Sequence, residues 1–229
     1  MTDVASPADH PAAEPPSDRT TVRRGANRAG FKTDQIRQIL AAGALAHIGV
    51  VTDDGPVVLP MVYGVRNDGD AADLLLHGAL ANAMLFAGRS LDVCVTVTLL
   101  DGLVIARTPL HNSMNYRSVV VRGTATAIDD ADDKLAALKI INDHIVASWD
   151  TARPPRASDV RRTLVIRVPL AEASAKVRAG DPVDEHDDLG GPHWAGVIGL
   201  KSTWETPISA ADLRSDIAIP DNVAALGDS

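Results

Sequence analysis

Two polar stretches of the sequence hold most of the side chains that could bind a small molecule. Residues 111–118 carry an imidazole, two amides, two hydroxyls, a phenol and a guanidinium within eight positions. Ser174, Lys176 and Arg178 alternate along the chain, so in an extended segment they share one face and offer two cations to an anion. The alternative interpretations are a polar turn whose side chains bind their own backbone, and solvated surface cations.

His77 is the ionisable side chain whose position best suits chemistry. It stands beside Gly78 at the end of a predicted strand, and histidine is the side chain whose charge changes near neutral pH. A histidine that only fixes the following loop is the alternative. His111 and Ser113 lie two residues apart in a loop, a spacing that does not indicate a nucleophile and its base. Cys94 lies in the middle of a strand and is interpreted as a small buried hydrophobic residue.

Several motifs that would indicate other functions are missing. The acidic run at 181–188 includes one histidine but lacks the glycine and the ligand spacing of a calcium loop, so it predicts a solvated loop and no metal site. The sequence has no Gly-x-Gly-x-x-Gly fingerprint after a strand, no P-loop and no Gly-x-Ser-x-Gly elbow. The common nucleotide-binding and hydrolase chemistries are therefore not supported.

The composition bounds the class of protein. With 229 residues, 45% hydrophobic and 23% charged, the chain can bury one sizeable core or two small ones. A single cysteine excludes an internal disulfide framework. The net charge of -8 and the aromatic content of 3% argue against nucleic acid as a partner and favour a small molecule or a protein. No apolar run approaches the ~18 residues of a membrane span, and the start lacks signal-peptide features, so a cytoplasmic protein without a membrane partner is predicted.

The hydrophobic periodicity predicts many short strands and few helices. Helices are expected from Thr33, as N-cap, to Gly43; at 81–88; and from the N-cap Asp130 to the Arg-Pro-Pro run at 153–155, with Leu138, Ile141, Ile145 and Trp149 as a buried stripe. Asp/Gly pairs, including Asp101-Gly102, are expected to form turns. Strands are expected at 44–51, 56–65, 73–79, 92–98, 103–107, 119–128, 163–170 and 197–200.

These elements predict a mainly β fold with peripheral helices (α+β), a small antiparallel barrel, because hairpins dominate and most strands are not followed by a helix. The chain divides into three expected parts. Residues 1–27, which are rich in proline, form a disordered lead; residues 28–208 form the folded domain; and residues 209–229 form a C-terminal tail.

An ordered set of short motifs gives the sequence a family resemblance. The motifs are His-Gly-Ala at 77–79, Val-Cys-Val-Thr-Val-Thr at 93–98, Asp-Gly-Leu-Val-Ile-Ala-Arg at 101–107, Asn-Tyr-Arg-Ser-Val-Val-Val at 115–121, Glu-Ala-Ser-Ala-Lys-Val-Arg-Ala-Gly at 172–180 and Trp-Ala-Gly-Val at 194–197. In this order and at these spacings the chain, from about residue 28 to 207, resembles the flavin-nucleotide-binding proteins related to pyridoxamine 5'-phosphate oxidase. The branch of nitroimidazole-resistance-type reductases is the most similar.

The resemblance implies an FMN-binding split β-barrel of antiparallel Greek-key type. It implies a homodimer with FMN in clefts between the subunits, and strand faces such as those of Val119 and Val121 partly buried between the protomers. It also implies a set of cofactor-contacting residues, with His77 as the catalytic candidate. The set is Leu59, Pro60, Met61, Val62, Tyr63, His77, Gly78, Asn82, Ser113, Asn115, Tyr116, Arg117, Ser118, Lys176, Arg178 and Trp194.

The sequence departs from the family pattern where the cofactor phosphate is held. Relatives commonly carry Ser or Thr followed by Arg or Lys shortly after the His-Gly pair, whereas this chain has Asn82 and Ala83. A charge-assisted hydrogen bond is about twice as strong as a neutral one. Weaker phosphate binding is therefore expected unless Arg107, Arg117 or Lys176 compensates.

Two functions are compatible with these features. The first is an FMN-dependent oxidoreductase that passes electrons from a reduced nicotinamide or similar donor to a small acceptor. The second is a non-catalytic or differently loaded split-barrel binder, which holds heme, a deazaflavin cofactor or another ligand in the same cleft or holds none. The missing cation near Asn82 favours the second hypothesis modestly.

Overall fold

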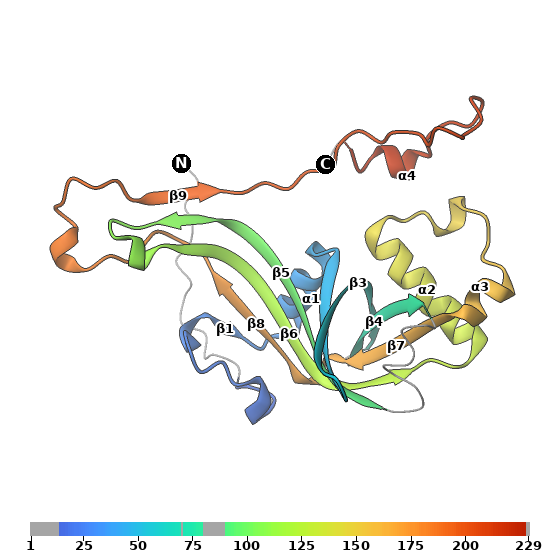
Figure 1. The fold of residues 1–229 in the computed structure, drawn as a ribbon, viewed down its shortest axis with the longest axis horizontal. Helices are drawn as coiled ribbons and strands as arrows, with labels where there is room; N and C mark the ends of the chain where they lie inside the picture. The colour runs from blue at the N-terminus through green and yellow to red at the C-terminus, as the bar shows by residue number, and fades with distance from the viewer. Residues whose placement is uncertain (1–13, 70, 80–89, 228–229) are drawn as a thin grey trace.

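Nine strands form one antiparallel sheet that closes on itself. The computed structural model describes residues 14–69, 71–79 and 90–227, which Figure 1 draws as a coloured ribbon. In this part of the chain the strand order is β1-β8-β6-β7-β4-β3-β2-β5-β9, and a further pairing of β5 with β6 closes the barrel. The strands are β1 (Ala29–Gly30), β2 (Leu45–Thr52), β3 (Gly55–Asp68), β4 (Ala71–Ala79), β5 (Leu91–Ile105), β6 (Ser113–Ala127), β7 (Thr163–Pro169), β8 (Ala173–Arg178) and β9 (Gly196–Gly199). The predicted mainly β, antiparallel fold is confirmed.

Strand β6 has three neighbours. One edge pairs with β5 from residue 113 to residue 125, with a bulge in β5 between Leu100 and Gly102. The other edge pairs with β8 at 116–121 and then with β7 at 126–127. Because β7 and β8 leave this edge in different directions, the outer parts of β5 and β6 run beyond the barrel as a long hairpin (Figure 1).

The predicted turn at Asp101-Gly102 is wrong. The strands expected at 92–98 and 103–107 are one strand, β5, which continues through the bulge. Gly102 is needed there because β9 pairs with β5 at this point, and a Cβ at Gly102 would lie 2.6 Å from the Ile198 carbonyl oxygen. The Asp-Gly pair alone suggested a turn. The pairing with β9, a strand distant in sequence, instead keeps this segment extended.

Four α-helices lie outside the sheet in the described residues: α1 (Thr33–Ala42), α2 (Ala131–Ile145), α3 (Ala157–Arg162) and α4 (Asp221–Ala224). Asp130 caps α2 as predicted, because its carboxylate accepts hydrogen bonds from the backbone N–H groups of Asp132 and Asp133. The cap of α1 is Lys32, one residue before the predicted Thr33. Helix α2 ends at Ile145, well before 153–155, and Trp149 begins a separate short turn at Trp149–Thr151.

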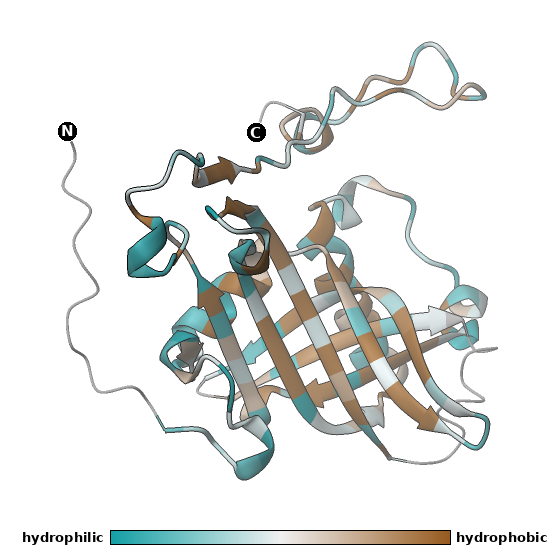
Figure 2. Ribbon diagram, turned by 60° about the vertical axis from the view of Figure 1, so that its left-hand side comes forward, coloured by the Kyte–Doolittle hydropathy of each residue, from teal (hydrophilic) through white to brown (hydrophobic). Residues whose placement is uncertain are grey.

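The sheet separates two apolar cores. The larger fills the barrel and includes Val95, Val97, Val119 and Val121, in line with the alternating apolar and polar residues along the barrel strands in Figure 2. The smaller lies between the sheet and α2, around Ile141 and its neighbours. The expectation that Val119 and Val121 lie between protomers is wrong, because both are buried inside their own barrel.

Tyr63 joins the barrel to α1 and α2. Its side chain is fully buried, and its hydroxyl donates to the carbonyls of Leu40 at 2.6 Å and Gly43 at 2.8 Å. Burial raises the pKa of the phenol well above its usual value, so the hydroxyl stays protonated. The ring also packs against that of His144, whose Nε2 lies 2.7 Å from the Gly43 carbonyl. Tyr63 thus ties the end of α1 to the core.

Part of the chain before β1 packs on the barrel. Thr20 is buried, Arg19 pairs with Asp92 at 2.8 Å, and Lys176 Nζ donates to the Arg24 carbonyl at 2.8 Å. Residues 19–24 of the expected disordered lead make these contacts, and its first 13 residues lie outside the described part. The helix expected at 81–88 also lies outside it.

The chain after β9 runs along one side of the molecule. Residues 200–227, which we call the C-terminal arm, end in α4 and lie mostly exposed (Figure 1). Among the described residues, none of the helices has the length and apolar character needed to cross a membrane.

Replacing Tyr63 by phenylalanine removes a hydroxyl that serves two buried carbonyls. We expect Tyr63→Phe to lower the free energy of unfolding by about 1–3 kcal/mol in urea denaturation, the range for buried polar groups left unpaired. Tyr116→Phe is the matched control, because Tyr116 is the other tyrosine and is only partly buried. Equal losses in the two variants would contradict the role given to the Tyr63 hydroxyl.

Candidate functional site

Several of the predicted cofactor residues meet where β6 lies beside β8. Tyr116 lies opposite Arg178, and Ser118 lies opposite Lys176. The Ser118 hydroxyl donates to the Lys176 carbonyl at 3.3 Å, although the two residues are 58 positions apart in sequence. Lys176 Nζ reaches the Arg24 carbonyl and keeps part of its donor capacity. The structure therefore brings the two polar stretches of the sequence onto neighbouring strands.

Arg178 and Asn115 fix the turn that follows β8. Both side chains are almost fully buried. The Arg178 guanidinium donates to the Asn115 side-chain oxygen, to the Gly180 carbonyl at 3.2 Å and to the Asp181 carbonyl at 3.0 Å. The Asn115 amide donates to the same Gly180 carbonyl at 3.1 Å. These contacts give both residues a structural role, because they use most of the polar atoms that a cofactor would need.

Arg117 is held by Asp101 across the hairpin. Its guanidinium forms a two-pronged contact with the Asp101 carboxylate, with Nε–Oδ2 and Nη2–Oδ1 distances of 3.0 and 2.7 Å. The hydrogen bond to Asp101 raises the pKa of Arg117 further. A phosphate that approached Arg117 would have to compete with this carboxylate, so Arg117 is less free to bind an anion than its sequence position suggested.

The five β3 residues predicted as one cofactor wall lie on different surfaces. Leu59 and Met61 pack on the barrel core, and Tyr63 lies within it. Val62 packs on the second core beneath α2. Pro60 is the one of the five that is exposed. Because successive side chains of a strand point to opposite faces, a continuous run of five residues does not line a single wall.

His77 lies on β4, opposite Val165 of β7, and is partly buried. Burial lowers the pKa of its imidazole, because surroundings of low polarity disfavour the charged form. The ring is therefore neutral at physiological pH. Gly78 follows it in the strand, whereas Asn82 and Ala83, where the family pattern changes, lie outside the described residues.

A shallow groove of about 320 Å³ lies on the outer face of β2, β3 and β5. Its apolar wall includes Val51 and Val58, which are 76% and 64% exposed. Its polar edge carries Arg19, which pairs with Asp92, and Arg122. In the described part of the chain Arg122 has no ion pair and no side-chain hydrogen bond. The groove therefore combines an apolar wall with a guanidinium that is free to bind an anion.

Sequence reasoning did not single out Arg122, although part of the signal was present. Buried Val119 and Val121 alternate along β6, so Arg122 must point to the outer face. The neighbours of Arg122 are determined by the register of β5 and β6, which places Arg122 opposite Cys94. This position lies next to the wall formed by β2 and β3. Cys94 is accordingly half-buried on this face, and its predicted full burial is wrong.

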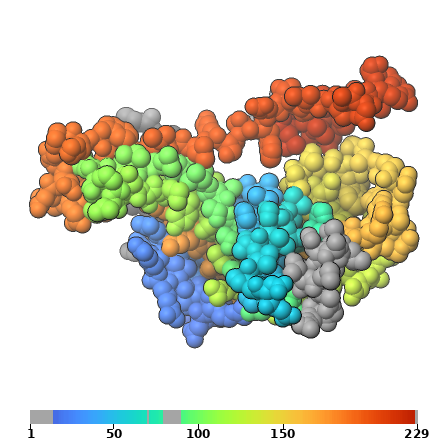
Figure 3. All heavy atoms as spheres, viewed as in Figure 1, coloured from blue at the N-terminus to red at the C-terminus, as the bar shows by residue number. Residues whose placement is uncertain are grey.

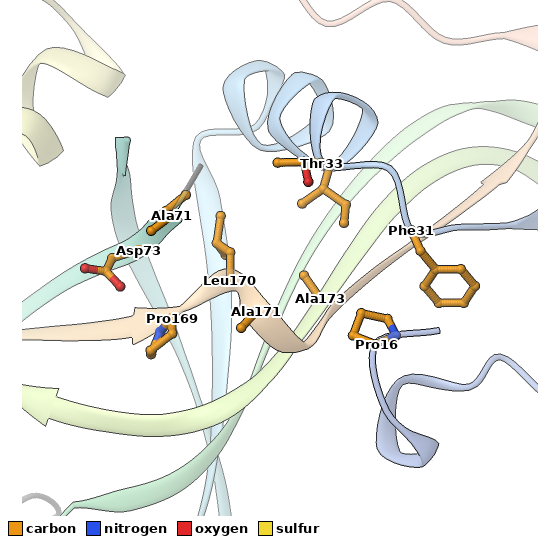
Figure 4. A pocket seen from close by; sticks show the side chains of 11 residues that line it. Pro16, Phe31, Thr33, Ala71, Asp73, Pro169, Leu170, Ala171 and Ala173 are labelled. Carbon is orange, nitrogen blue, oxygen red and sulfur yellow. The ribbon is translucent and has the colours of Figure 1, made fainter. Parts of the chain in front are cut away.

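A second cavity, of about 260 Å³, lies between α1, the start of β4 and the 169–173 segment. Figure 4 shows Phe31 and Pro16 on one side and Asp73 on the other. Asp73 is the charged residue of this lining, and it already accepts a hydrogen bond from Arg66 at 2.5 Å. A cavity whose charged group is a paired carboxylate does not suit a phosphate, and no predicted cofactor residue lines it.

The acidic run at 181–188 is anchored to the hairpin. The Asp184 side chain is 1% exposed and accepts hydrogen bonds from the Arg107 backbone N–H at 2.9 Å and its guanidinium at 2.7 Å. Burial alone would raise the pKa of Asp184, but the bonds from Arg107 outweigh it and hold the pKa below the usual value. The predicted fully solvated loop is wrong at this residue. Among the described residues, no three His, Cys, Asp or Glu side chains are placed to hold a metal ion.

The predicted site residues thus fall into two groups in one chain. The first lies on β6, β8 and the hairpin, where Ser113 pairs with β5 and the Trp194 ring rests against Gly196. The second lies on β3 and β4, elsewhere in the barrel (Figure 1). In the described residues no hydrogen bond or ion pair joins the two groups. One copy of the chain therefore does not gather all of them into a single site.

Comparison with known proteins identifies the family. Residues 32–177 match the family model described as pyridoxamine 5'-phosphate oxidase. Because this match spans more than half of the chain, the protein belongs to the pyridoxamine 5'-phosphate oxidase family, and the predicted split barrel is confirmed. A comparison with curated protein sequences gives no match.

Solved structures resemble the chain over different lengths. The flavocytochrome Anf3 from Azotobacter vinelandii is 35% identical, with a TM-score of 0.86 over 93% of this chain and 99% of its own. The FAD and heme binding protein from Mycobacterium smegmatis is 27% identical, with a TM-score of 0.79 over 87% and 97%. A protein from Bacteroides thetaiotaomicron assigned to 5-nitroimidazole antibiotic resistance is 26% identical, with a TM-score of 0.53 over 65% and 86%. The first two similarities therefore extend well beyond the shared barrel.

Neutralising Asp184 tests the anchor of the acidic run. Its lowered pKa means that the stabilisation is present at neutral pH and is lost as the pH falls through the folded-state pKa. We expect Asp184→Asn to lower the free energy of unfolding at pH 7, with a smaller difference from wild type in acid. Asp187→Asn is the control, because Asp187 is fully exposed. A difference that stays constant or grows as the pH falls would count against the anchor.

Proposed function

We propose that this protein binds a flavin and a heme and passes electrons between them and a small molecule. The observation that carries the proposal is the 35% identity to a flavocytochrome over 93% of this chain. The similarity to an FAD and heme binding protein over 87% of the chain supports it. When bound, a flavin supplies hydride and electron transfer and a heme supplies one-electron chemistry, while the protein orients and encloses both.

The residues of the outer groove suit a flavin nucleotide. Val51 and Val58 offer an apolar wall to a ring, and the free guanidinium of Arg122 offers a charge-assisted hydrogen bond to a phosphate. Binding in the groove would remove both valines from water. Arg122 thereby supplies a cation that the sequence lacks at Ala83.

His77 suits a heme. Heme iron is commonly held by a neutral imidazole nitrogen, and burial keeps the His77 ring neutral at physiological pH. In the described residues the ring has no hydrogen-bond partner that would withhold a nitrogen from iron. His77 would thus hold the heme iron through an imidazole nitrogen, a more specific role than the catalytic one expected from the sequence.

A homodimer fits the separation of the two residue groups. The groove of about 320 Å³ is at the lower end for a small-molecule pocket and is open on one side. A second copy placed against it would add the missing wall and exclude water. The other residue group, on β6 and β8, would then meet the groove from the partner subunit.

An FMN-dependent oxidoreductase without heme is the second candidate. The family match at residues 32–177 favours it, as does the similarity to a protein assigned to 5-nitroimidazole antibiotic resistance. Expression with added hemin and riboflavin, followed by an absorbance spectrum, separates the two candidates. A flavin band near ~450 nm together with a Soret band supports the flavocytochrome, and a flavin band alone supports the second candidate. Chromatography of the extracted flavin distinguishes FAD, FMN and deazaflavin, and a colourless protein would contradict both proposals.

Removing the groove cation should weaken flavin binding. We expect Arg122→Ala to raise the dissociation constant of the flavin roughly 10- to 150-fold, which corresponds to losing a contact of about 1.5–3 kcal/mol to a charged group. Quenching of flavin fluorescence on titration into apoprotein measures it. Arg162→Ala on α3 is the matched control, because Arg162 is exposed and pairs only with Asp159. An unchanged dissociation constant of the flavin in Arg122→Ala would show that Arg122 does not bind the phosphate.

Removing the imidazole of His77 should prevent heme retention. We expect His77→Ala to lose the Soret band and keep the flavin band, with His186→Ala, an exposed histidine, as control. Because protonation competes with iron for the nitrogen, the affinity of the wild type for heme should fall once the pH drops below the lowered pKa of His77. A Soret band that persists in His77→Ala would assign the iron to another residue.

A further inference from the structure

The C-terminal arm exposes a row of large apolar side chains. Ile208 is 94% exposed and Trp204 is 58% exposed. Figure 3 shows open space between the middle of the arm and the barrel. Exposed apolar surface that adds up to several hundred Å² is typical of an interaction site. The row consists of Leu200, Trp204, Ile208, Leu213, Ile217 and Ile219.

The arm is held at both ends. At its start the Leu200 N–H donates to the Asp101 carbonyl at 3.0 Å, which continues the pairing of β9 with β5. Near its end the Asn222 side chain donates to the Ala147 carbonyl at 2.6 Å, beyond α2. Gly227 packs on the backbone around residue 206, which folds the end of the arm back on itself. The apolar row is therefore presented at a defined position beside the barrel.

The same chain carries an apolar surface without cover. On the outer face of the barrel, Leu45, Val51 and Val58 of β2 and β3 are 48%, 76% and 64% exposed. Val51 and Val58 line the groove that ends at Arg122, and Cys94 lies in the same groove, whereas Leu45 lies farther along β2. These side chains share one face of two paired strands, since Val51 lies opposite Pro56 and Val58 lies opposite Gly49.

We propose that the C-terminal arm of each copy lies across the β2–β3 outer face of a second copy and forms the outer wall of its groove. Both complementary surfaces belong to one chain, so a two-fold axis satisfies both at once, as in an isologous dimer. Half-exposed side chains of this size offer roughly 100 Å² each, so the six offer on the order of 600 Å², most of the about 800 Å² per partner of a standard interface.

A second copy fits this surface better than an unrelated partner. The family match ends at residue 177, yet the flavocytochrome similarity covers 93% of the chain, which requires that it includes most of residues 178–229. A large part of the chain beyond the family match is therefore shared with a whole protein of this fold. The inference rests on the dimer proposed above and deepens it, because it adds the C-terminal arm to the β6 and β8 residues as a second part of the partner's contribution to the groove.

Sedimentation of the full-length protein with its cofactors tests the arm. We expect a dimer for wild type, and for Trp204→Ser combined with Ile208→Ser a dimer dissociation constant raised at least about 100-fold. These two side chains are exposed in one copy, so their replacement leaves the barrel core intact. Val51→Ser with Val58→Ser on the receiving face should have the same effect. Leu135→Ser on α2 is the control, because Leu135 is an exposed apolar residue that belongs neither to the apolar row of the arm nor to the lining of the groove.

Cross-linking locates the contact. A cysteine placed at Thr203, joined by a short bis-maleimide to Cys94 of the other copy, should give covalent dimers, and these should vanish with Cys94→Ser. A tight dimer in the Trp204 and Ile208 variant, or the absence of covalent dimers, would overturn the arm contact while leaving the proposed dimer and its cofactors intact. A wild-type monomer at every concentration would overturn both the arm contact and the dimer.

Discussion

The ladder along β6 is the constraint on which the rest of the structure depends. One edge of β6 pairs with β5 along almost the whole strand. The other edge pairs first with β8 and, a few residues later, with β7. A buried backbone group left unpaired costs about 1–3 kcal/mol, so β7 and β8 must meet β6 at nearly adjacent points. Gly123 sits at this change of partner, where a Cβ would lie 3.4 Å from the Val168 side chain.

The same division of β6 creates the parts that surround the candidate site. Because β7 turns into the barrel and β8 turns away from it, β5 and β6 continue outward as the hairpin that carries β9 and the arm. Buried polar contacts then fix the base of this hairpin: Arg178 and Asn115 hold one turn, and Arg107 with Asp184 holds the acidic run. The hairpin is therefore positioned by charge-assisted hydrogen bonds, and the barrel by apolar packing.

The outer face of the barrel is where the remaining apolar surface and a free cation coincide. The inner faces of the barrel strands pack against the core. Val51 of β2, Val58 of β3 and Arg122 of β6 lie on the outer face and are exposed to solvent in one copy. The cofactor that we propose would use such a surface, because exclusion of water strengthens the electrostatic contacts that orient it. One copy of the chain supplies only one wall of the groove. A ligand in the groove would therefore be shielded from water only when a second wall covers it.

Much of the architecture could be predicted from the sequence because it depends on local patterns. The alternation of Val93, Val95 and Val97 fixed which face of β5 is buried, Asp130 marked the start of α2, and the ordered motifs indicated the family. Period and capping are properties of neighbouring residues, so they do not require knowledge of the partner strand.

The composition of the candidate site was decided by tertiary structure. Alternation alone placed Arg122 on the outer face, but only the register of β2, β3, β5 and β6 surrounded it with an apolar wall. Likewise, Arg117 pairs with Asp101, and Arg178 donates its hydrogen bonds to the backbone of the 178–181 turn. Tyr63 is buried in the core, where its hydroxyl donates to the Leu40 carbonyl. Local sequence determines which way a side chain points. The group that it meets is determined by strands paired across tens of residues, because their closure depends on the packing of the whole barrel.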